Sequence, residues 1–144
     1  HPVNCVTAPE ADVYCGWLDR RLPTEQEWEK AARGSCEKND LSEDACQGSR
    51  VYPWGKDAPT CSTAAMSGCP GDTVPVTAYS GVDSPYGTAN QSGNVWEWTS
   101  SKSGSNRVRR GGSFYHGARF LRASYRYHVT PSARVAYVGF RCAR

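Results

Sequence analysis

Residues 86–101 read YGTANQSGNVWEWTSS, and residues 107–114 read RVRRGGSF. Each stretch joins a short run of alternating apolar and polar residues to a loop of Gly, Asn and Ser, which is typical of a short strand beside a tight turn. We therefore expect strands at residues 94–99 and 106–113, and a third at residues 73–79. Gly, Pro, Ser and Asp recur every few residues further along the chain, so the sequence predicts a loop-rich α+β domain with short antiparallel strands.

Two short helices are expected before these strands. The capping-box pattern T-x-x-E, which satisfies free amides at a helix start, occurs at residues 7–10 and 24–27. It predicts helices at residues 8–18 and 25–33, the second ending at Gly34. Helical spacing directs these side chains toward the core: Ala11, Tyr14, Cys15 and Leu18 from the first helix, and Trp28, Ala31 and Ala32 from the second.

The composition is that of one ordinary domain. The chain has 144 residues, of which 22% are charged, and its net charge is only +3. Because this charge is spread along the chain, no basic block indicates a nucleic-acid partner. No apolar run approaches the roughly 20 residues that a membrane helix requires, and His1 opens the chain without a signal-peptide pattern.

Seven cysteines are many for a cytosolic protein, and none of them stands in a C-x-x-C pair. Such a framework predicts a protein outside the cytoplasm, secreted or at a cell surface. Cys5 is left without a partner, and three alternatives stay open for it: a partner outside this sequence, a buried inert thiol or a free reactive thiol. The expected disulfides are Cys36–Cys46 around an acidic insertion, Cys61–Cys69 around a loop of small residues, and the long-range pair Cys15–Cys142.

Five motifs occur along the chain in a fixed order: RLPTEQEWEKAARG (21–34), YPWG (52–55), YGTANQSGNVWEWTSS (86–101), RVRRGGSF (107–114) and GFRCAR (139–144). This series resembles that of the formylglycine-generating enzyme or sulfatase-modifying-factor family, and the resemblance covers residues 2–144. It implies a single domain at residues 1–144 with a variant of the C-type-lectin fold, lacking the early N-terminal strands of the family domain. It also implies that a disulfide between Cys15 and Cys142 ties the first helix to the last strand.

The resemblance further implies a structural calcium ion. In ANQSGNVWEW, Asn90 and Glu97 match side-chain ligands of the family, while Gly93 and Val95 match carbonyl ligands. Hard oxygen donors on an irregular loop suit Ca²⁺, and a single carboxylate predicts modest affinity. Without the resemblance, Glu97 is equally well explained as the buried partner of an arginine, and Asn90 as a turn residue.

The catalytic residues that the family would supply are missing from the expected interval. A formylglycine-generating enzyme oxidises a cysteine of its substrate with a copper-holding pair of cysteines that belongs between GGS and GFRC, but residues 114–141 contain no cysteine. Another branch of the family builds an iron site from three histidines, whereas His1, His116 and His128 match no such motif. We therefore expect no copper and no enzymatic activity.

Residues 111–144 carry aromatic and small side chains where family members often carry Asn. The runs FYH, YHV and VAY cannot alternate in and out of one strand, so several of these side chains must be exposed. For Phe114 and Phe120 a core position is an equal alternative. Rigid Tyr and Phe rings are the contact residues of antibody paratopes. The predicted ligand-binding residues are Phe114, Tyr115, His116, Phe120, Tyr125, Tyr127, His128, Val129, Ala133, Val135, Ala136 and Tyr137.

The composition of this segment indicates how it arose. Diversity-generating retroelements of phages and bacteria rewrite adenines at the end of genes for such lectin-fold proteins, so that AAC codons become NNC codons. All twelve residues fit NNC codons, and Lys, Glu, Gln, Met and Trp, which do not, are absent from residue 111 onward. The chain thus resembles a retroelement variable protein of a bacterium or phage, with residues 111–144 as its variable region.

Three functions follow from these patterns. We favour a non-catalytic module that displays a variable aromatic surface to a protein or surface ligand. One alternative is a copper oxidase of the formylglycine-generating type that acts on a sulfatase cysteine, which copper binding would support. The other is a calcium-dependent carbohydrate-binding domain, which requires direct evidence because a lectin fold alone does not imply sugar binding.

Overall fold

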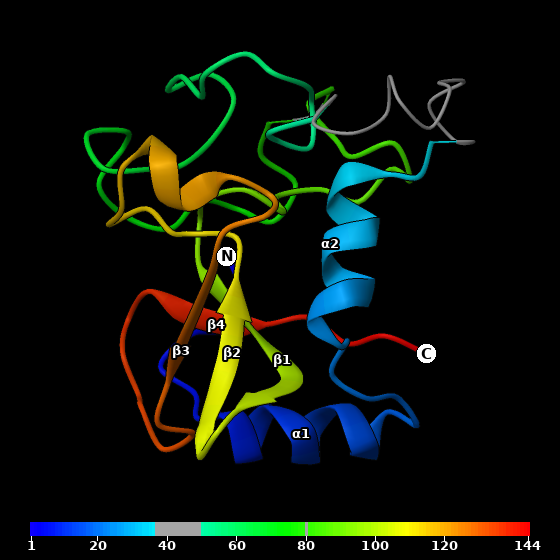
Figure 1. The fold of residues 1–144 in the computed structure, drawn as a ribbon. Coiled ribbons are helices and arrows are strands. Elements are labelled where there is room, and N and C mark those ends of the chain that lie inside the picture. The colour runs from blue at the N-terminus through cyan, green and yellow to red at the C-terminus, as the bar shows by residue number, and fades with distance from the viewer. Residues whose placement is uncertain (37–49, 80) are drawn as a thin grey trace.

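The computed structural model describes residues 1–36, 50–79 and 81–144. In Figure 1, α1 (Ala8–Trp17) crosses below a small sheet, α2 (Glu25–Arg33) stands beside it, and long loops lie above it together with the 3-10 helix η2 (Ala118–Leu121). None of the helices in these described ranges combines the length and the apolar character needed to cross a bilayer. The strands are β1 (Trp96–Ser103), β2 (Asn106–Arg110), β3 (Arg126–Val129) and β4 (Val138–Phe140).

The sheet has the strand order β3-β2-β1-β4. The pairs β1–β2 and β2–β3 are antiparallel, but β4 runs parallel to β1, so the sheet is mixed rather than wholly antiparallel as expected. A parallel neighbour requires a long connection, which the chain between β1 and β4 supplies. The last strand therefore pairs with β1 at the edge of the sheet, where Val138 and Gly139 are buried.

Both helices begin at the predicted capping boxes, formed by Thr7 and by Thr24. The prediction for the buried side of α1 was partly wrong, since Tyr14 is 49% exposed and Leu18 is 41% exposed. The buried stripe of α1 consists of small residues, which lets the helix lie close to the sheet and leaves larger side chains at its rim. Those buried residues are Ala8, Ala11 and Cys15.

Two strand predictions also need correction. Residues 73–79 form a turn rather than a strand, because Pro75 cannot donate to a ladder and its carbonyl instead accepts from Ala78 N at 2.9 Å. The strand expected at residues 106–113 ends at Arg110, since the next residue, Gly111, has a φ of 97° that extended backbone does not allow.

Two disulfides fasten the described chain. Cys15–Cys142 joins α1 to the segment after β4, and Cys61–Cys69 closes the expected small-residue loop. Cys5 is a free, exposed thiol. The predicted Cys36–Cys46 pair includes Cys46, which lies outside the described residues.

One buried carboxylate connects β1, α2 and the end of the chain. Glu97 is only 6% exposed. Its Oε2 accepts from Trp28 Nε1 at 2.5 Å and from Arg141 Nε at 2.6 Å, while its Oε1 accepts from Arg141 Nη2 at 2.7 Å. The sequence-based alternative of Glu97 as the buried partner of an arginine is therefore observed.

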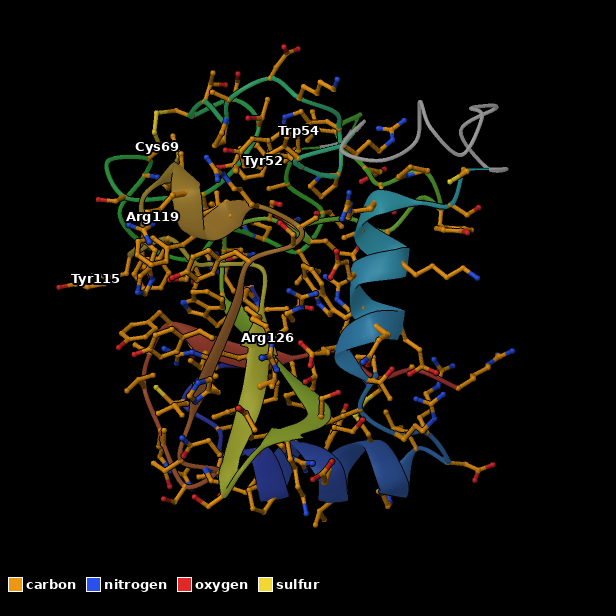
Figure 2. All side chains as sticks on the ribbon, in the orientation of Figure 1. Tyr52, Trp54, Cys69, Tyr115, Arg119 and Arg126 are labelled. Atoms are coloured by element: carbon orange, nitrogen blue, oxygen red, sulfur yellow. A yellow bond between two sulfur atoms is a disulfide. The ribbon has the colours of Figure 1, made fainter. Side chains whose placement is uncertain are left out.

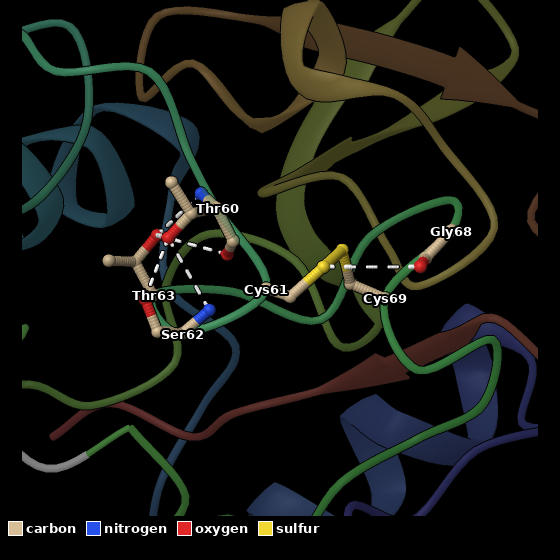
Figure 3. Close-up of a disulfide and its surroundings, with 6 residues drawn as sticks. All are labelled: Thr60, Cys61, Ser62, Thr63, Gly68 and Cys69. Carbon is tan, nitrogen blue, oxygen red and sulfur yellow. Dashed lines mark hydrogen bonds between the residues drawn. A yellow bond between two sulfur atoms is a disulfide. The ribbon is translucent and has the colours of Figure 1, made fainter.

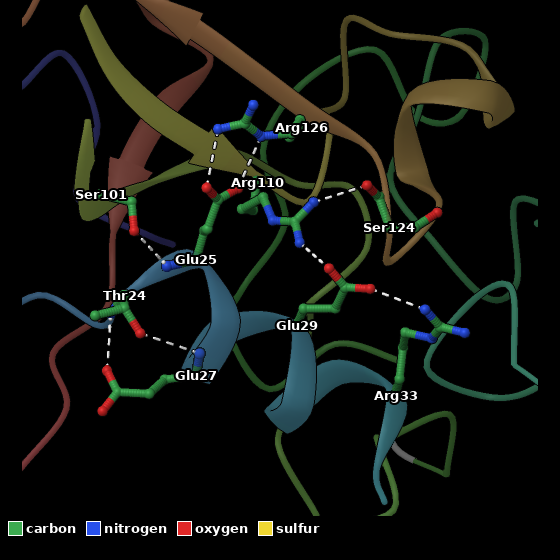
Figure 4. A network of polar contacts seen from close by, with 9 residues as sticks. All are labelled: Thr24, Glu25, Glu27, Glu29, Arg33, Ser101, Arg110, Ser124 and Arg126. Atoms are coloured by element: carbon green, nitrogen blue, oxygen red, sulfur yellow. Dashed lines mark hydrogen bonds and ion pairs between the residues drawn. The ribbon is translucent and has the colours of Figure 1, made fainter. Parts of the chain in front are cut away.

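A second polar network attaches α2 to β2 and β3 (Figure 4). Arg110 donates to a carboxylate oxygen of Glu29 and, at 2.8 Å, to the Ser124 carbonyl. Arg126 holds Glu25 with two bonds of 2.8 and 2.9 Å. Because charge-assisted bonds have narrow geometry, these contacts fix the position of the helix against the strands.

We expect Arg141→Gln to lower the free energy of unfolding by about 2 to 3 kcal/mol, because it leaves the buried Glu97 carboxylate without its countercharge. Arg21→Gln is the matched control, since Arg21 binds Glu27 with the same two-bond geometry but both side chains are about half exposed. There we expect a much smaller loss, because exposed ion pairs are screened by solvent. Urea unfolding in chelator, followed by Trp fluorescence, measures both; equal losses would contradict a special role for Glu97.

Candidate functional site

A pair of glycines directs the chain out of the sheet and into the candidate site. Gly111 and Gly112 have φ values of 97° and 72°. A Cβ at Gly112 would lie 2.7 Å from Leu121 Cδ1 and 2.9 Å from the Phe120 carbonyl oxygen, so no larger residue fits. Phe114 N then donates to the Asn94 carbonyl at 2.9 Å. The backbone of the predicted binding segment is thus fixed to the strand region before it.

Trp96 and Arg109 form the floor of the site. Trp96 is 1% exposed and Arg109 is 6% exposed. The Arg109 guanidinium carbon lies 5.1 Å from the Trp96 ring centroid and 4.9 Å from that of Tyr127. These distances are in the range of cation–π contacts. A buried cation is therefore enclosed by rings of both the constant and the predicted variable parts of the chain.

Six predicted residues gather on this floor, and we call them the aromatic cluster. Tyr115 and Tyr137 stack with centroids 5.5 Å apart and planes 10° apart. His116 makes edge contacts with Phe120 at 5.2 Å and with Tyr137 at 5.3 Å. In Figure 2, Tyr115 projects from the edge of the molecule; it is 67% exposed. The members of the aromatic cluster are Tyr115, His116, Phe120, Tyr125, Tyr127 and Tyr137.

The other six predicted residues lie around the cluster or beside the core. Val129, Ala133 and Val135 pack, half-buried, against the core cluster that includes α1 and Trp98. His128 is exposed, and its Nδ1 lies 3.2 Å from Asn106 Nδ2. Ala136 is exposed and Phe114 is half-buried. None of the twelve predicted residues is fully buried, so the core alternative for Phe114 and Phe120 holds only in part.

His116 is the polar centre of the aromatic cluster. Its Nδ1 lies 3.2 Å from Trp96 Nε1, which can only donate, and 2.6 Å from Ser113 Oγ. Nδ1 is therefore an unprotonated acceptor, and the neutral ring carries its proton on Nε2. Burial and the nearby charge of Arg109 lower the pKa of His116, so the imidazole is neutral at neutral pH.

The Cys61–Cys69 disulfide closes a loop (Figure 3) that contacts the segment carrying the aromatic cluster. Thr60 N donates to Thr63 Oγ1 at 2.8 Å, which orders the start of this loop. Within the loop, Ser67 N donates to the His116 carbonyl at 3.0 Å. The disulfide thus stabilises a segment that touches the candidate site directly.

Three arginines of the C-terminal segment make different contacts. Arg126 binds Glu25, and Arg134 binds Glu10 as well as the Cys5 carbonyl at 2.9 Å. Arg119 instead lies over the Phe120 ring at 5.2 Å. Arg119 therefore belongs to the surroundings of the aromatic cluster, whereas the other two attach the segment to the helices.

The sequence prediction missed Trp96 and Arg109. Trp96 was assigned to a strand without a role in binding, and Arg109 was one of three arginines in RVRR. Strand alternation could have placed Arg109 on the opposite face from Arg110, but the rings around it come from residues 127 and 137, far along the chain. Only the tertiary structure brings these together.

The predicted calcium ligands lie near one cavity of about 700 Å³ that Asn90, Val95 and Glu97 help to line. Asn90 Nδ2 donates to the carbonyls of Val76 and Ala78, but its buried Oδ1 has no hydrogen-bond donor. Glu97 Oε1 accepts a single bond, from Arg141, and so retains an open lone pair. These two oxygens fit a hard cation, although the Arg141 charge next to them favours weak binding.

Comparison with known proteins identifies relatives that are longer than this chain. Hercynine oxygenase of Mycolicibacterium thermoresistibile is 37% identical over 166 residues, which cover 99% of this chain and 35% of that protein. Inactive C-alpha-formylglycine-generating enzyme 2 of Mus musculus is 36% identical over 161 residues, which cover 99% of this chain and 48% of that protein. The chain therefore spans less than half the length of these two curated relatives.

Solved structures share the fold. Treponema denticola variable protein 1 superposes with a TM-score of 0.63 at 26% identity, covering 84% of this chain and 46% of that one. The P3c variant of the major tropism determinant has a TM-score of 0.61 at 18% identity, covering 94% of this chain and 36% of that one, and shows the fold alone. The expected fold, of the C-type-lectin type, is thereby confirmed.

The family model of the sulfatase-modifying factor enzyme 1-like domain matches residues 1–144. The match includes the helix motif at residues 21–34, the WEW strand and the closing GFRC that carried the sequence resemblance. The chain belongs to the sulfatase-modifying factor enzyme 1-like domain family.

Proposed function

We propose that this chain is a non-catalytic binding module whose aromatic cluster contacts a protein or surface ligand. The observation that carries the proposal is how burial is distributed along residues 111–144. None of the twelve predicted contact residues is fully buried, whereas seven small or apolar residues that lie before, between and after them are. Those buried residues are Gly111, Gly112, Ser113, Leu121, Ala123, Val138 and Gly139.

The chemistry of the surface supports the same proposal. Tyr and Phe rings provide large, rigid contact area at low cost in side-chain entropy, and they dominate natural paratopes. The cluster rests on the buried Trp96 and on a backbone held by hydrogen bonds, so its rings can change without loss of the core. A structural neighbour named as a variable protein is consistent with such use of the fold.

The absence of catalysis is likewise part of the proposal. Residues 114–141 lack cysteine, and the three histidines contact different parts of the chain: Thr73, Trp96 and Asn106. In the described ranges, no three His, Cys, Asp or Glu side chains converge on one point. The relatives include proteins named as oxygenases and one named as inactive, so their names leave the activity of this chain open. The disulfides support a location at the cell surface or in the surrounding medium.

Replacing Tyr115, Tyr127 and Tyr137 together by Asn should leave the protein folded but abolish its binding of peptides selected from a random phage-displayed library on the wild-type protein. Tyr115 and Tyr127 are exposed and Tyr137 is not fully buried, so the substitution removes no fully buried ring. A control with Tyr14, Trp17 and Tyr86 changed to Asn removes similarly exposed rings outside the cluster and should bind normally. Unfolding of the cluster variant, or unchanged peptide binding, would contradict the proposal.

The proposed diversification has a genetic test. In sibling copies of the coding region, substitutions should fall in the codons for the twelve contact residues, at positions where an adenine-rich near-repeat carries adenine. They should spare Gly112, Leu121 and Val138, where burial or a positive φ permits no exchange. Sequencing the locus, together with any adenine-rich near-repeat and reverse transcriptase gene beside it, measures this pattern. Substitutions spread evenly over buried and exposed codons would exclude a retroelement origin.

We also propose that Ca²⁺ binds between Asn90 Oδ1 and Glu97 Oε1, with the carbonyls of Gly93 and Val95 as further ligands. Calcium at 100 times its dissociation constant should then raise the free energy of unfolding by about 2.7 kcal/mol, because a ligand of the native state alone stabilises it. Asn90→Ala should remove this gain, whereas Asn106→Ala at the distant β1–β2 turn should retain it. Thermal unfolding in calcium, magnesium and chelator is the measurement, and a gain retained in Asn90→Ala would reject the site.

A further inference from the structure

Strand β2 carries three arginines, and one of them differs from the other two. Arg107 binds Asp12, and Arg110 binds Glu29. Arg109 takes part in no ion pair with any residue of the described chain. It is nevertheless the residue of β2 that lies beneath the aromatic cluster, so the unpaired charge and the candidate site coincide.

The close neighbours of Arg109 in the described chain supply no negative charge. The side chain is 6% exposed, and its buried Nε has no hydrogen-bond acceptor. Its close neighbours are the rings of Trp96, Tyr127 and Tyr137, with centroids 5.1, 4.9 and 5.7 Å from the guanidinium carbon. Its polar neighbours are the phenol groups of Tyr127 and Tyr137, and Tyr137 is within hydrogen-bonding reach of the guanidinium. Burial accordingly lowers the pKa of Arg109 from its ordinary value.

A guanidinium in this setting favours an anionic guest. Arg stays charged in proteins, and its planar fork of N–H donors matches the two oxygens of a carboxylate. Aromatic rings can stack on the faces of the guanidinium, but the donors at its edge require an acceptor. Tyr127, which contacts the guanidinium, is itself 45% exposed, so the charge lies one side chain below the surface.

We propose that Arg109 and the rings around it form a carboxylate subsite, which receives an Asp or Glu side chain of a protein ligand. This inference rests on the proposed binding function and deepens it. Arg109 precedes residue 111 and lies outside the predicted variable region, whereas Tyr127 and Tyr137 lie inside it. Every variant of the protein would therefore keep the same cationic anchor and change the rings around it.

The test uses two neutral-backbone probes that differ only in charge: N-acetyl-aspartic acid amide and N-acetyl-asparagine amide. In NMR titrations of the wild-type protein, the aspartic probe should shift the Arg109 Nε–H and Tyr127 signals to saturation, and the asparagine probe should not. The bound carboxylate should also raise the pKa of His116, because it offsets the nearby Arg109 charge. Equal responses to the two probes, or none at Arg109, would overturn the subsite.

Substitutions can distinguish a specific role of Arg109 from the effect of any positive charge near the aromatic cluster. Arg109→Gln should weaken the aspartic probe at least about tenfold, as expected when one partner of a buried charge pair is removed. Arg119→Gln is the matched control, because Arg119 also lies over a ring of the cluster but is exposed, and it should change affinity less than about threefold. If Arg109→Gln does not fold, Arg109→Lys replaces it and should lose affinity with the charge retained, because Lys lacks the fork.

The outcomes distinguish this subsite from the broader proposal. Peptides selected on the wild-type protein should be enriched in Asp or Glu, and Arg109→Gln should lose them while Arg119→Gln binds them. Selected peptides that need the three tyrosines but carry no acid and bind Arg109→Gln normally would refute the subsite and leave the binding function intact. Inorganic phosphate shifting Arg109 without the aspartic probe doing so would also refute the carboxylate assignment.

Discussion

The bonds from Trp28 and Arg141 to the Glu97 carboxylate join three segments that are distant in sequence. They attach α2 to β1 and the end of the chain to both. The carboxylate is buried, so its hydrogen bonds tolerate little change in geometry. Removal of one partner would leave an uncompensated charge in an environment that solvates charge poorly. Because Arg141 directly follows β4, this contact also holds the last strand parallel to β1.

The candidate site depends on that arrangement. β4 in its observed place brings Tyr137 back toward His116 and Tyr115, which leave the sheet through the Gly111–Gly112 turn. Hydrogen bonds from Phe114 N to the Asn94 carbonyl and from Ser67 N to the His116 carbonyl then fix the backbone where the cluster begins. The rings contact one another and the buried Trp96, but none of them is fully buried, so the proposed exchange at these positions would leave this backbone in place.

Arg109 gives the site a positive charge, which the aromatic residues do not supply. Arg107 and Arg110 are neutralised by acids from α1 and α2, whereas Arg109 faces only rings and phenols. Burial of such a charge is costly unless a partner is supplied. The carboxylate of a ligand would supply this partner. The proposed site would therefore prefer ligands with acidic surfaces over other ligands that an aromatic surface can contact. In the proposed binding module, a constant charge beneath variable rings would combine one fixed requirement, a ligand carboxylate, with many ligand shapes.

The sequence by itself determined the local elements and the family: the capping boxes set both helix starts, and the motifs from RLPTEQEWEKAARG to GFRCAR identified the domain. It also predicted that several side chains of the runs FYH, YHV and VAY are exposed, because such runs cannot alternate within one strand, and each run contains at least one exposed side chain. Only the tertiary structure decided the parallel pairing of β4, the surface position of Tyr14 and the unpaired state of Arg109. The physical reason is that burial and charge pairing arise from contacts between distant residues, which local spacing does not encode.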